Sequence, residues 1–185
     1  MANKLCFFFG TVCSSKTMQL LATLHNYEKV GWKTIAIKPA LDTRSELIET
    51  RAHVPPHKAD IVINKDESLY DYKELVSSAD VILVDECQFL TPEQVDELRE
   101  ISINQGIDIL CFGLRTDFNA KLFDASKRLF ELADEITEIK TICNVCGKHA
   151  SFNKRVDSTD ADGNIIPGWD NFEARCWKHF SSMDD

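Results

Sequence analysis

The sequence predicts an α/β fold, in which helices flank a parallel sheet, followed by a small C-terminal unit that binds a metal. Strand-like apolar runs alternate with helical patterns through the first 140 residues, as in parallel sheets with crossover helices. The first apolar run passes through Gly10 into a polar loop and then into Lys16-Thr17, where a helical pattern begins. Metal-ligand residue types occur in two pairs beyond this region, where the apolar runs stop. We therefore expect a core over residues 1–140 and a second unit over 141–185.

In the first half of the core, turn residues separate the predicted elements. An apolar stripe from Met18 to Leu24 predicts a helix that ends at Gly31. Pro39 stops the strand that follows, and residues 40–60 have no clear periodicity, which predicts a long loop. The expected elements here are strands over 5–9, 33–38 and 60–63 and helices over 16–30 and 70–76.

The second half of the core contains the clearest strand and the clearest helix start. Val81–Val84 is a continuous apolar run, typical of a strand that is buried on both faces. Thr91, Pro92 and Gln94 supply an N-cap, a proline at the first helical position and a capping box. The expected elements here are strands over 81–84, 107–112 and 136–142, helices over 91–104 and around 125–132, and a loop over 113–119.

The loop after the first strand resembles a phosphate-binding loop. Its layout approaches Gly-x-x-x-x-Gly-Lys-Ser/Thr, in which loop N–H groups and a helix N-terminus face an anion. Lys16 would reach the outer phosphates, and the Thr17 hydroxyl would bind Mg²⁺. The residues expected to contact the nucleotide are Gly10, Thr11, Val12, Cys13, Ser14, Ser15, Lys16 and Thr17.

Ser15 occupies the position of the second glycine in this motif. Glycine is favoured where the backbone needs a positive φ angle or approaches a phosphate closely. If the left-handed region is required, serine costs about 1–2 kcal/mol there. We therefore expect nucleotide binding to be weakened rather than lost.

Asp85 and Glu86 follow the buried strand over 81–84. Ligands bind beyond the carboxyl ends of parallel strands, so the fold is expected to bring this pair beside the phosphate loop. Asp85 is then suited to hold Mg²⁺ and Glu86 to take a proton from a hydroxyl group or water. The alternative is a solvated acidic turn without a ligand.

Cys143, Cys146, Cys176 and His179 form two pairs, each with two intervening residues, as in tetrahedral Zn²⁺ sites. Four protein ligands leave no open position, which favours a structural ion. The alternatives are a disulfide or incidental cysteines, and His149 is a competing ligand without the paired spacing. The intervening stretch lacks the final acid of a calcium loop and is expected to turn at Asp162-Gly163.

The composition argues against several classes of protein. The formal net charge of −9 argues against a broad nucleic-acid-binding face. No apolar run approaches the length of a membrane span and no secretory signal is evident. Seven cysteines, an odd number, do not form a disulfide framework and favour a reducing, cytoplasmic location.

Further motifs occur in a fixed order: Lys38-Pro39-Ala40-x-Asp42-Thr43-Arg44, Val84-Asp85-Glu86-x-Gln88-Phe89, Gly113-Leu114-x-x-Asp117-Phe118 and Lys121-Leu122-Phe123. With the phosphate loop and the zinc tetrad, they cover nearly the whole chain. This ordered set resembles the type II, zinc-containing thymidine kinase family, and most closely its compact viral and phage branch. The resemblance implies a P-loop NTPase core and a zinc-pinned lasso, a loop that closes over the nucleoside.

The resemblance implies transfer of the γ-phosphate of Mg·ATP to the 5′-hydroxyl of thymidine, which gives dTMP. It makes Glu86 the general base and places Mg²⁺ at Asp85 and Thr17. It places Asp42, Thr43, Arg44 and Gln88 on the ATP side of the site. It implies that the nucleoside is enclosed by Phe89, Leu114, Phe118, Phe123, Asn153, Gly163, Asn164, Ile165, Ile166, Pro167 and Phe172.

The chain departs from the family pattern at several positions. Val12 stands where methionine is usual, Arg115 replaces an acidic residue, Phe172 replaces a tyrosine, and Pro167 replaces a flexible glycine. The resemblance also implies a homotetramer or a dimer. Two other functions stay open: a nucleotide-binding relative weakened by Ser15, and a P-loop ATPase or zinc-ribbon adaptor on nucleic acid, which the acidic charge disfavours.

Overall fold

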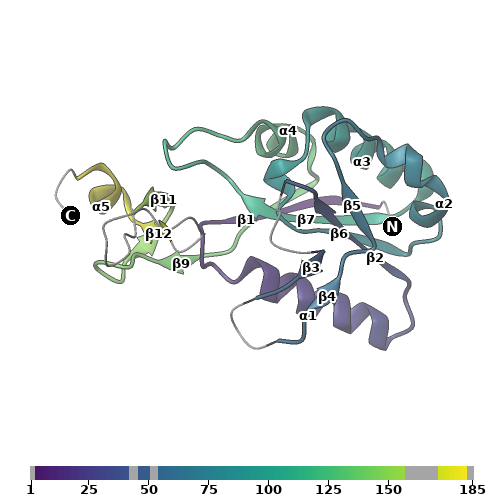
Figure 1. Cartoon of the computed structure of the whole chain (residues 1–185), viewed down its shortest axis with the longest axis horizontal. Helices are drawn as coiled ribbons and strands as arrows, with labels where there is room; N and C mark the ends of the chain where they lie inside the picture. Colours follow the sequence, from purple (N-terminus) through teal and green to yellow (C-terminus); the bar gives the residue numbers. More distant parts are fainter. Residues whose placement is uncertain (1–2, 42–45, 51–53, 157–170, 183–185) are drawn as a thin grey trace, which may run out of the picture.

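In the computed structural model, which describes residues 3–41, 46–50, 54–156 and 171–182, a six-stranded sheet has the order β5-β2-β6-β7-β1-β8 (Figure 1). Each of its neighbouring strand pairs is parallel. The alternation of strand-like and helical segments predicts this arrangement. The strands are β1 (Leu5–Gly10), β2 (Thr34–Pro39), β5 (Ile61–Ile63), β6 (Val81–Val84), β7 (Asp108–Leu114) and β8 (Glu135–Glu138).

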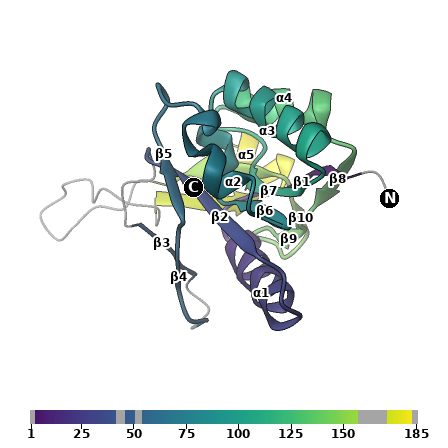
Figure 2. The ribbon, with the colours of Figure 1, turned by 90° about the vertical axis from the view of Figure 1, so that its right-hand side faces the viewer.

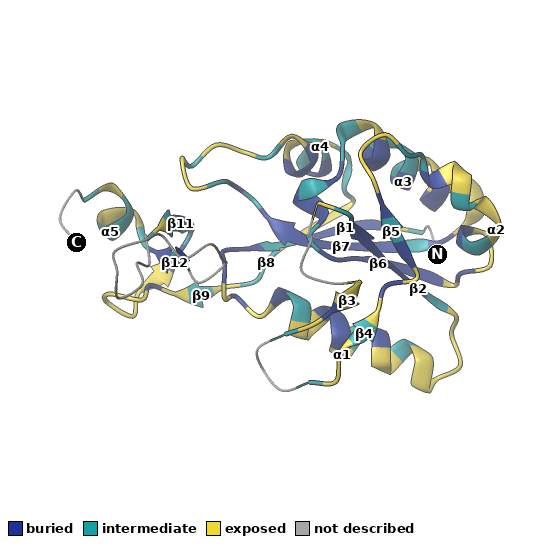
Figure 3. Ribbon diagram, in the orientation of Figure 1, coloured by how far each residue is buried: buried dark blue, intermediate teal, exposed yellow. Residues whose placement is uncertain are grey.

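Helices cover both faces of the sheet (Figures 1 and 2). Alternate residues of a strand point to opposite faces, so Leu5 and Phe7 pack on one side and Cys6 on the other. The first side carries α3 (Pro92–Gln105) and α4 (Asp124–Leu132), and the second carries α1 (Lys16–Lys29). All four residues of β6 are buried, as the continuous apolar run predicts (Figure 3).

The start of α3 forms as its sequence predicts. The backbone N–H of Gln94 donates to the Thr91 hydroxyl at 3.2 Å, and the N–H of Thr91 donates to the Gln94 side chain at 3.0 Å. Gly106 ends the helix in the left-handed conformation, with a φ of 72°. The capping box therefore fixes the start of α3, the helix that follows Asp85 and Glu86 in the chain.

Three segments differ from their predicted form. Within 40–60, β3 (Leu47–Ile48) and β4 (His57–Lys58) form a short antiparallel ribbon, and Ile48 is buried in the core under α1. The predicted strand over 136–142 is two strands, because the chain leaves the sheet after β8 and pairs again as β9 (Thr141–Ile142). In addition, the helix expected over 70–76 begins as the 3₁₀ turn η1 (Leu69–Tyr72) and continues as α2 (Lys73–Val76).

The C-terminal unit lies beyond the carboxyl end of β1 and is built from short elements (Figure 1). Among the residues of this unit that the structure describes, the buried apolar cluster consists of Cys143, Ala150 and Ala174, with Cys176 packed against it. So small a core needs another source of stability, such as a metal. The elements are β9, β10 (His149–Ala150), β11 (Phe152–Arg155), β12 (Phe172–Arg175) and α5 (Trp177–Ser181).

Among the helices of the described ranges, none is both long enough and apolar enough to cross a membrane.

Candidate functional site

The loop between β1 and α1 is tightly packed around Gly10. A Cβ atom at Gly10 would lie 2.7 Å from the Ile139 carbonyl oxygen and would collide with the Ser14 hydroxyl. The side chains of Thr11 and Ser14 are buried within the loop. Glycine is therefore required at the point where β1 turns into the loop, as the phosphate-loop pattern predicts.

Lys16 is buried at the base of this loop, where α1 begins. Its Nζ donates to the Thr11 carbonyl at 2.7 Å and to the Ser14 hydroxyl at 3.4 Å. Burial lowers the pKa of Lys16, while the nearby Glu86 and Asp85 carboxylates oppose that shift. The loop thus curls around an ammonium group, and an anion with stronger acceptors can replace the two neutral oxygens that Lys16 now contacts.

Ser15 adopts the left-handed conformation, with φ 66° and ψ 23°. Its side chain makes no capping hydrogen bond to α1. Cys13, two residues earlier, also has a positive φ of 58°. The condition under which serine was expected to be costly at this position, a left-handed backbone, is therefore met, and the loop carries two non-glycine residues in a strained region.

Replacing Ser15 by glycine is expected to stabilise the protein by about 0.5–1 kcal/mol. Removing Cβ relieves about 1–2 kcal/mol of left-handed strain, and the greater freedom of glycine in the unfolded chain offsets part of that gain. We also expect ATP affinity to rise severalfold. Urea unfolding and nucleotide titration measure the two effects.

Ser77→Gly is the matched control for this substitution. Ser77 is exposed and right-handed, with a φ of −68°, so the same chemical change should lower stability there. A Ser15→Gly variant that is less stable than the wild type and binds ATP no better would contradict the strain account.

The acidic pair lies next to the loop, at the carboxyl end of β6. The Thr17 hydroxyl donates to Asp85 Oδ1 at 3.4 Å, so the fold brings the two predicted magnesium ligands together. Asp85 is buried, and burial, followed by the charge of Glu86, raises the pKa of Asp85 to about 7. A hydroxyl and a carboxylate oxygen in contact form a donor set that suits Mg²⁺.

Glu86 occupies the left-handed region, with φ 49° and ψ 39°, as the chain turns from β6 into the 3₁₀ turn η2 (Cys87–Phe89). Gln88 Nε2 donates to Glu86 Oε2 at 2.7 Å, and the Leu114 backbone N–H donates to Gln88 Oε1 at 2.9 Å. Gln88 is buried and so holds the Glu86 carboxylate in a fixed orientation. Left-handed backbone at a non-glycine residue is typical of functional positions.

Lys38 belongs to this site although the sequence analysis assigned it no role. It lies in β2, is 3% exposed, and donates from Nζ to the Leu47 carbonyl at 3.0 Å. Its charge counteracts the rise in the Asp85 pKa, so it is electrostatically coupled to that carboxylate. A lysine that follows the apolar run Ile35–Ile37, directly before Pro39, was the available signal.

Four of the predicted nucleoside-binding aromatic residues form two pairs. Phe89 and Phe123 contact edge to face with centroids 5.9 Å apart, and Phe118 and Phe172 lie 6.1 Å apart. Leu114, at the end of β7, is buried. The second pair joins the core to the C-terminal unit.

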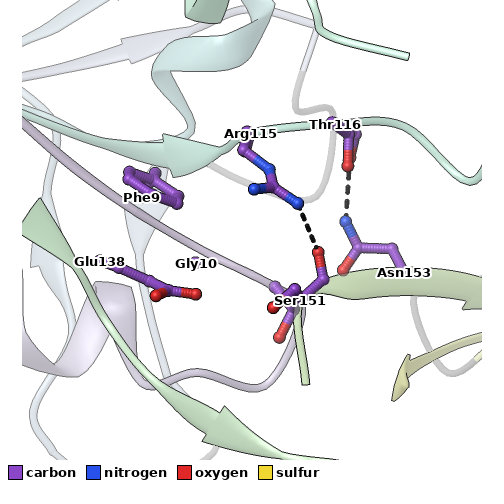
Figure 4. A pocket seen from close by; sticks show the side chains of 8 residues that line it. Phe9, Gly10, Arg115, Thr116, Glu138, Ser151 and Asn153 are labelled. Carbon is purple, nitrogen blue, oxygen red and sulfur yellow. Dashed lines mark hydrogen bonds between the residues drawn. The ribbon is translucent and has the colours of Figure 1, made fainter. Parts of the chain in front are cut away.

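A small pocket lies where the C-terminal unit meets the phosphate loop (Figure 4). Asn153 is buried there, accepts a hydrogen bond from the Val12 backbone N–H at 2.8 Å and donates to the Thr116 carbonyl at 2.9 Å. Arg115 donates to the Ser151 carbonyl at 3.0 Å (Figure 4). The pocket is lined by Phe9, Gly10, Thr11, Arg115, Thr116, Glu138, Ser151 and Asn153.

The four predicted metal ligands converge in the C-terminal unit, with their ligand atoms all within 4.8 Å of one another. The Cys146 and Cys176 sulfurs lie 3.8 Å apart, and His179 Nδ1 lies 3.3 Å from the Cys176 sulfur. A tetrahedron with metal–sulfur bonds of about 2.3 Å has edges of about 3.8 Å, so the group fits a metal ion. These sulfurs are too far apart for a disulfide bond.

The protonation of Cys143 also suits a metal ligand. Burial acts to raise the pKa of Cys143, but hydrogen bonds from the Cys176, Val145 and Cys146 backbones and from His179 outweigh it and lower that pKa to about 6. A thiolate is the form that binds metal. His149 is not in the group, because its Nε2 pairs with Glu138 at 3.0 Å.

Some predicted site residues lie outside the described ranges. They are Asp42, Thr43 and Arg44 on the nucleotide side, and Gly163, Asn164, Ile165, Ile166 and Pro167 of the predicted lasso, together with its expected turn at Asp162-Gly163.

Comparison with known proteins adds independent evidence. The family model described as thymidine kinase matches residues 3–180. A curated thymidine kinase of Streptococcus agalactiae serotype Ia is 33% identical over 186 residues, which cover 98% of each chain. That of Legionella pneumophila strain Paris is 33% identical over 96% of this chain and 88% of its own. That of Enterobacteria phage T4 is 34% identical over 97% of this chain and 96% of its own.

Likeness to solved structures is weaker. AMPPCP-bound DnaA from Aquifex aeolicus aligns with 76% of this chain and 41% of its own, at 22% identity and a TM-score of 0.46.

Proposed function

The chain belongs to the thymidine kinase family, and we propose that its phosphate loop and acidic pair transfer the γ-phosphate of ATP to the 5′-hydroxyl of thymidine. The observation that carries this proposal is the contact between Thr17 and Asp85, with Lys16 buried beside them. This contact joins the phosphate loop and the acidic pair into one site. If Asp85 and Glu86 were only a solvated acidic turn, no contact with the loop would be expected.

In the proposed mechanism, different residues bind the phosphates of ATP and transfer the proton. Residues 10–17 hold the phosphates through backbone N–H groups, and Lys16 neutralises charge on the outer phosphates. Glu86, which Gln88 orients, takes the proton of the 5′-hydroxyl as that oxygen attacks. We place Asp42, Thr43 and Arg44 on the phosphate side by family resemblance.

Two metal ions belong to the proposal. Asp85 and Thr17 would hold Mg²⁺, which offsets the charge that develops on the phosphate oxygens. Cys143, Cys146, Cys176 and His179 would hold a structural Zn²⁺, because sulfur and imidazole ligands in a closed tetrad are typical of zinc.

The nucleoside is proposed to bind between the core and the C-terminal unit, which we assign to residues 1–140 and 141–185. An apolar enclosure suits a base that carries a methyl group. By resemblance, a lasso over Gly163, Asn164, Ile165, Ile166 and Pro167 closes this site, and the assembly is a homotetramer. The enclosure is assigned to Phe89, Leu114, Phe118, Phe123, Asn153 and Phe172.

A kinase assay on the purified, zinc-loaded protein tests this function. With Mg·ATP, we expect 5′-phosphorylation of thymidine and little turnover of deoxycytidine, while deoxyuridine reports how strongly the enclosure uses the methyl group. Lys16→Met is the control for contaminating kinases, because it should lose turnover while keeping the fold.

The outcomes of this assay separate the remaining alternatives. ATP binding without turnover of any nucleoside would identify a catalytically weakened relative. Failure to bind ATP, or tight and salt-dependent DNA binding without turnover, would overturn the proposal.

A further inference from the structure

The Asn153 side chain joins three parts of the molecule. Asn153 lies in β11 of the C-terminal unit, its Oδ1 accepts from the Val12 N–H at 2.8 Å, and its Nδ2 donates to the Thr116 carbonyl at 2.9 Å. Only 4% of the residue is exposed. Both polar ends of the side chain are thus used within the protein, on the phosphate loop and on the segment after β7.

We propose that Asn153 is a positioning residue for ATP, through which the C-terminal unit sets the conformation of the phosphate loop. This inference rests on the proposed kinase function and gives Asn153 a role beyond a place beside the nucleoside. The loop contains left-handed backbone at Cys13 and Ser15, so it needs external contacts to stay in one conformation. The Asn153 bond supplies such a contact immediately before Cys13.

The strand that carries Asn153 is connected to the metal group. Asn153 is directly opposite Ala174 in the β11–β12 pair, and Ala174 packs in the same buried cluster as Cys143. The Ala174 carbonyl accepts a hydrogen bond from the Asn144 N–H at 3.0 Å, next to Cys143. A metal ion held by Cys143, Cys146, Cys176 and His179 would therefore fix the strand from which Asn153 reaches the loop.

A second contact holds the N-terminal end of β11 against the core. Arg115 Nη2 donates to the Ser151 carbonyl at 3.0 Å, and its guanidinium lies over the Phe9 and Phe152 rings at 5.9 and 5.7 Å. Arg115 and Thr116 are neighbours, so the segment after β7 is tied to Ser151 and to Asn153 at once (Figure 4). A shift of β11 relative to the core would therefore also displace the phosphate loop, because the contacts of Arg115 and Asn153 leave little freedom between the C-terminal unit and the core.

The test is direct binding of Mg·ADP to the zinc-loaded enzyme, measured without thymidine. Asn153→Ala should weaken binding about tenfold, because the phosphate loop loses its fixed conformation. Asn104→Ala is the matched control: it makes the same chemical change at an exposed asparagine of α3, so binding should stay within about twofold of the wild type.

Two readouts separate positioning from a general loss of structure. Zinc content should be unchanged in Asn153→Ala, and hydrogen exchange of the Val12 amide should accelerate in that variant and not in Asn104→Ala. Removing zinc from the wild type should weaken Mg·ADP binding to a similar extent, whereas zinc removal from Asn153→Ala should add little.

If the alanine variant does not fold, Asn153→Ser replaces it, since a serine hydroxyl is too short to contact Val12 and Thr116 together. A folded, zinc-loaded Asn153 variant that binds Mg·ADP as tightly as the wild type would overturn the positioning role. A wild-type protein that does not bind Mg·ADP at all would overturn the proposed function instead.

Discussion

Replacing Glu86 by glutamine should lower kcat by about 10³-fold, because an amide cannot accept the proton that Glu86 is proposed to take from the attacking 5′-hydroxyl. The substitution preserves the size of the side chain and its contact distance to Gln88. ATP and thymidine affinities should therefore change little, so the loss appears in kcat and not in KM. Steady-state kinetics with thymidine as the varied substrate measure this split.

Glu93→Gln is the matched control for Glu86→Gln. Glu93 is exposed in the first turn of α3, a few residues along the chain, and should keep full activity. A Glu86→Gln enzyme within tenfold of the wild type would show that another group, or water alone, removes the proton.

Replacing Asp85 by asparagine should have two opposite effects. Catalysis should fall by at least 10²-fold, because the carboxylate proposed to hold Mg²⁺ is lost. The magnesium-free and nucleotide-free protein should become more stable, because a buried carboxylate next to Glu86 is replaced by a neutral amide.

The sign of the pH dependence follows from the raised pKa of Asp85. The pKa rises from 3.8 to about 7 on folding, so between these values the folded protein holds a proton that the unfolded chain has released. Stability from this group is complete below the lower value and is lost as pH rises through the upper one. The stability advantage of Asp85→Asn should therefore widen by about 2 kcal/mol between about pH 5.5 and about pH 8.

Urea unfolding of both proteins across this pH range, in magnesium-free buffer, measures that difference. Asp66→Asn provides the matched control, because Asp66 is exposed and the same substitution there should give no pH-dependent change relative to the wild type. If the free energies of unfolding of Asp85→Asn and the wild type differed by the same amount at every pH, the proposal that folding raises the pKa of the buried Asp85 would be contradicted.

The parts of the fold that are specified locally could be predicted from the sequence. The capping box of Thr91 and Gln94 and the apolar run of β6 depend on neighbouring residues, and both form as expected. The metal tetrad was predictable because paired spacing leaves few alternatives. At Ser15, the glycine usual in the motif pointed either to a positive φ or to close approach of a phosphate, and the structure shows the positive φ.

The parts that depend on distant contacts could not be predicted in this way. The β3–β4 ribbon is held by burial of Ile48 under α1, which the sequence of that segment does not reveal. The break between β8 and β9 depends on where the sheet ends. The bonds of Asn153 to Val12 and Thr116 join residues far apart in sequence, so only the folded structure reveals them.

The position of β1 between β7 and β8 has a consequence for biosynthesis. β1 is made first, yet its partners in the sheet begin at Asp108 and Glu135, more than a hundred residues later. Contacts so distant in sequence form slowly, and at 5–20 residues per second the ribosome needs several seconds or more to supply them. During that interval the apolar run over residues 5–9 must be kept from aggregating, so we expect the nascent chain to rely on chaperones until β8 has emerged.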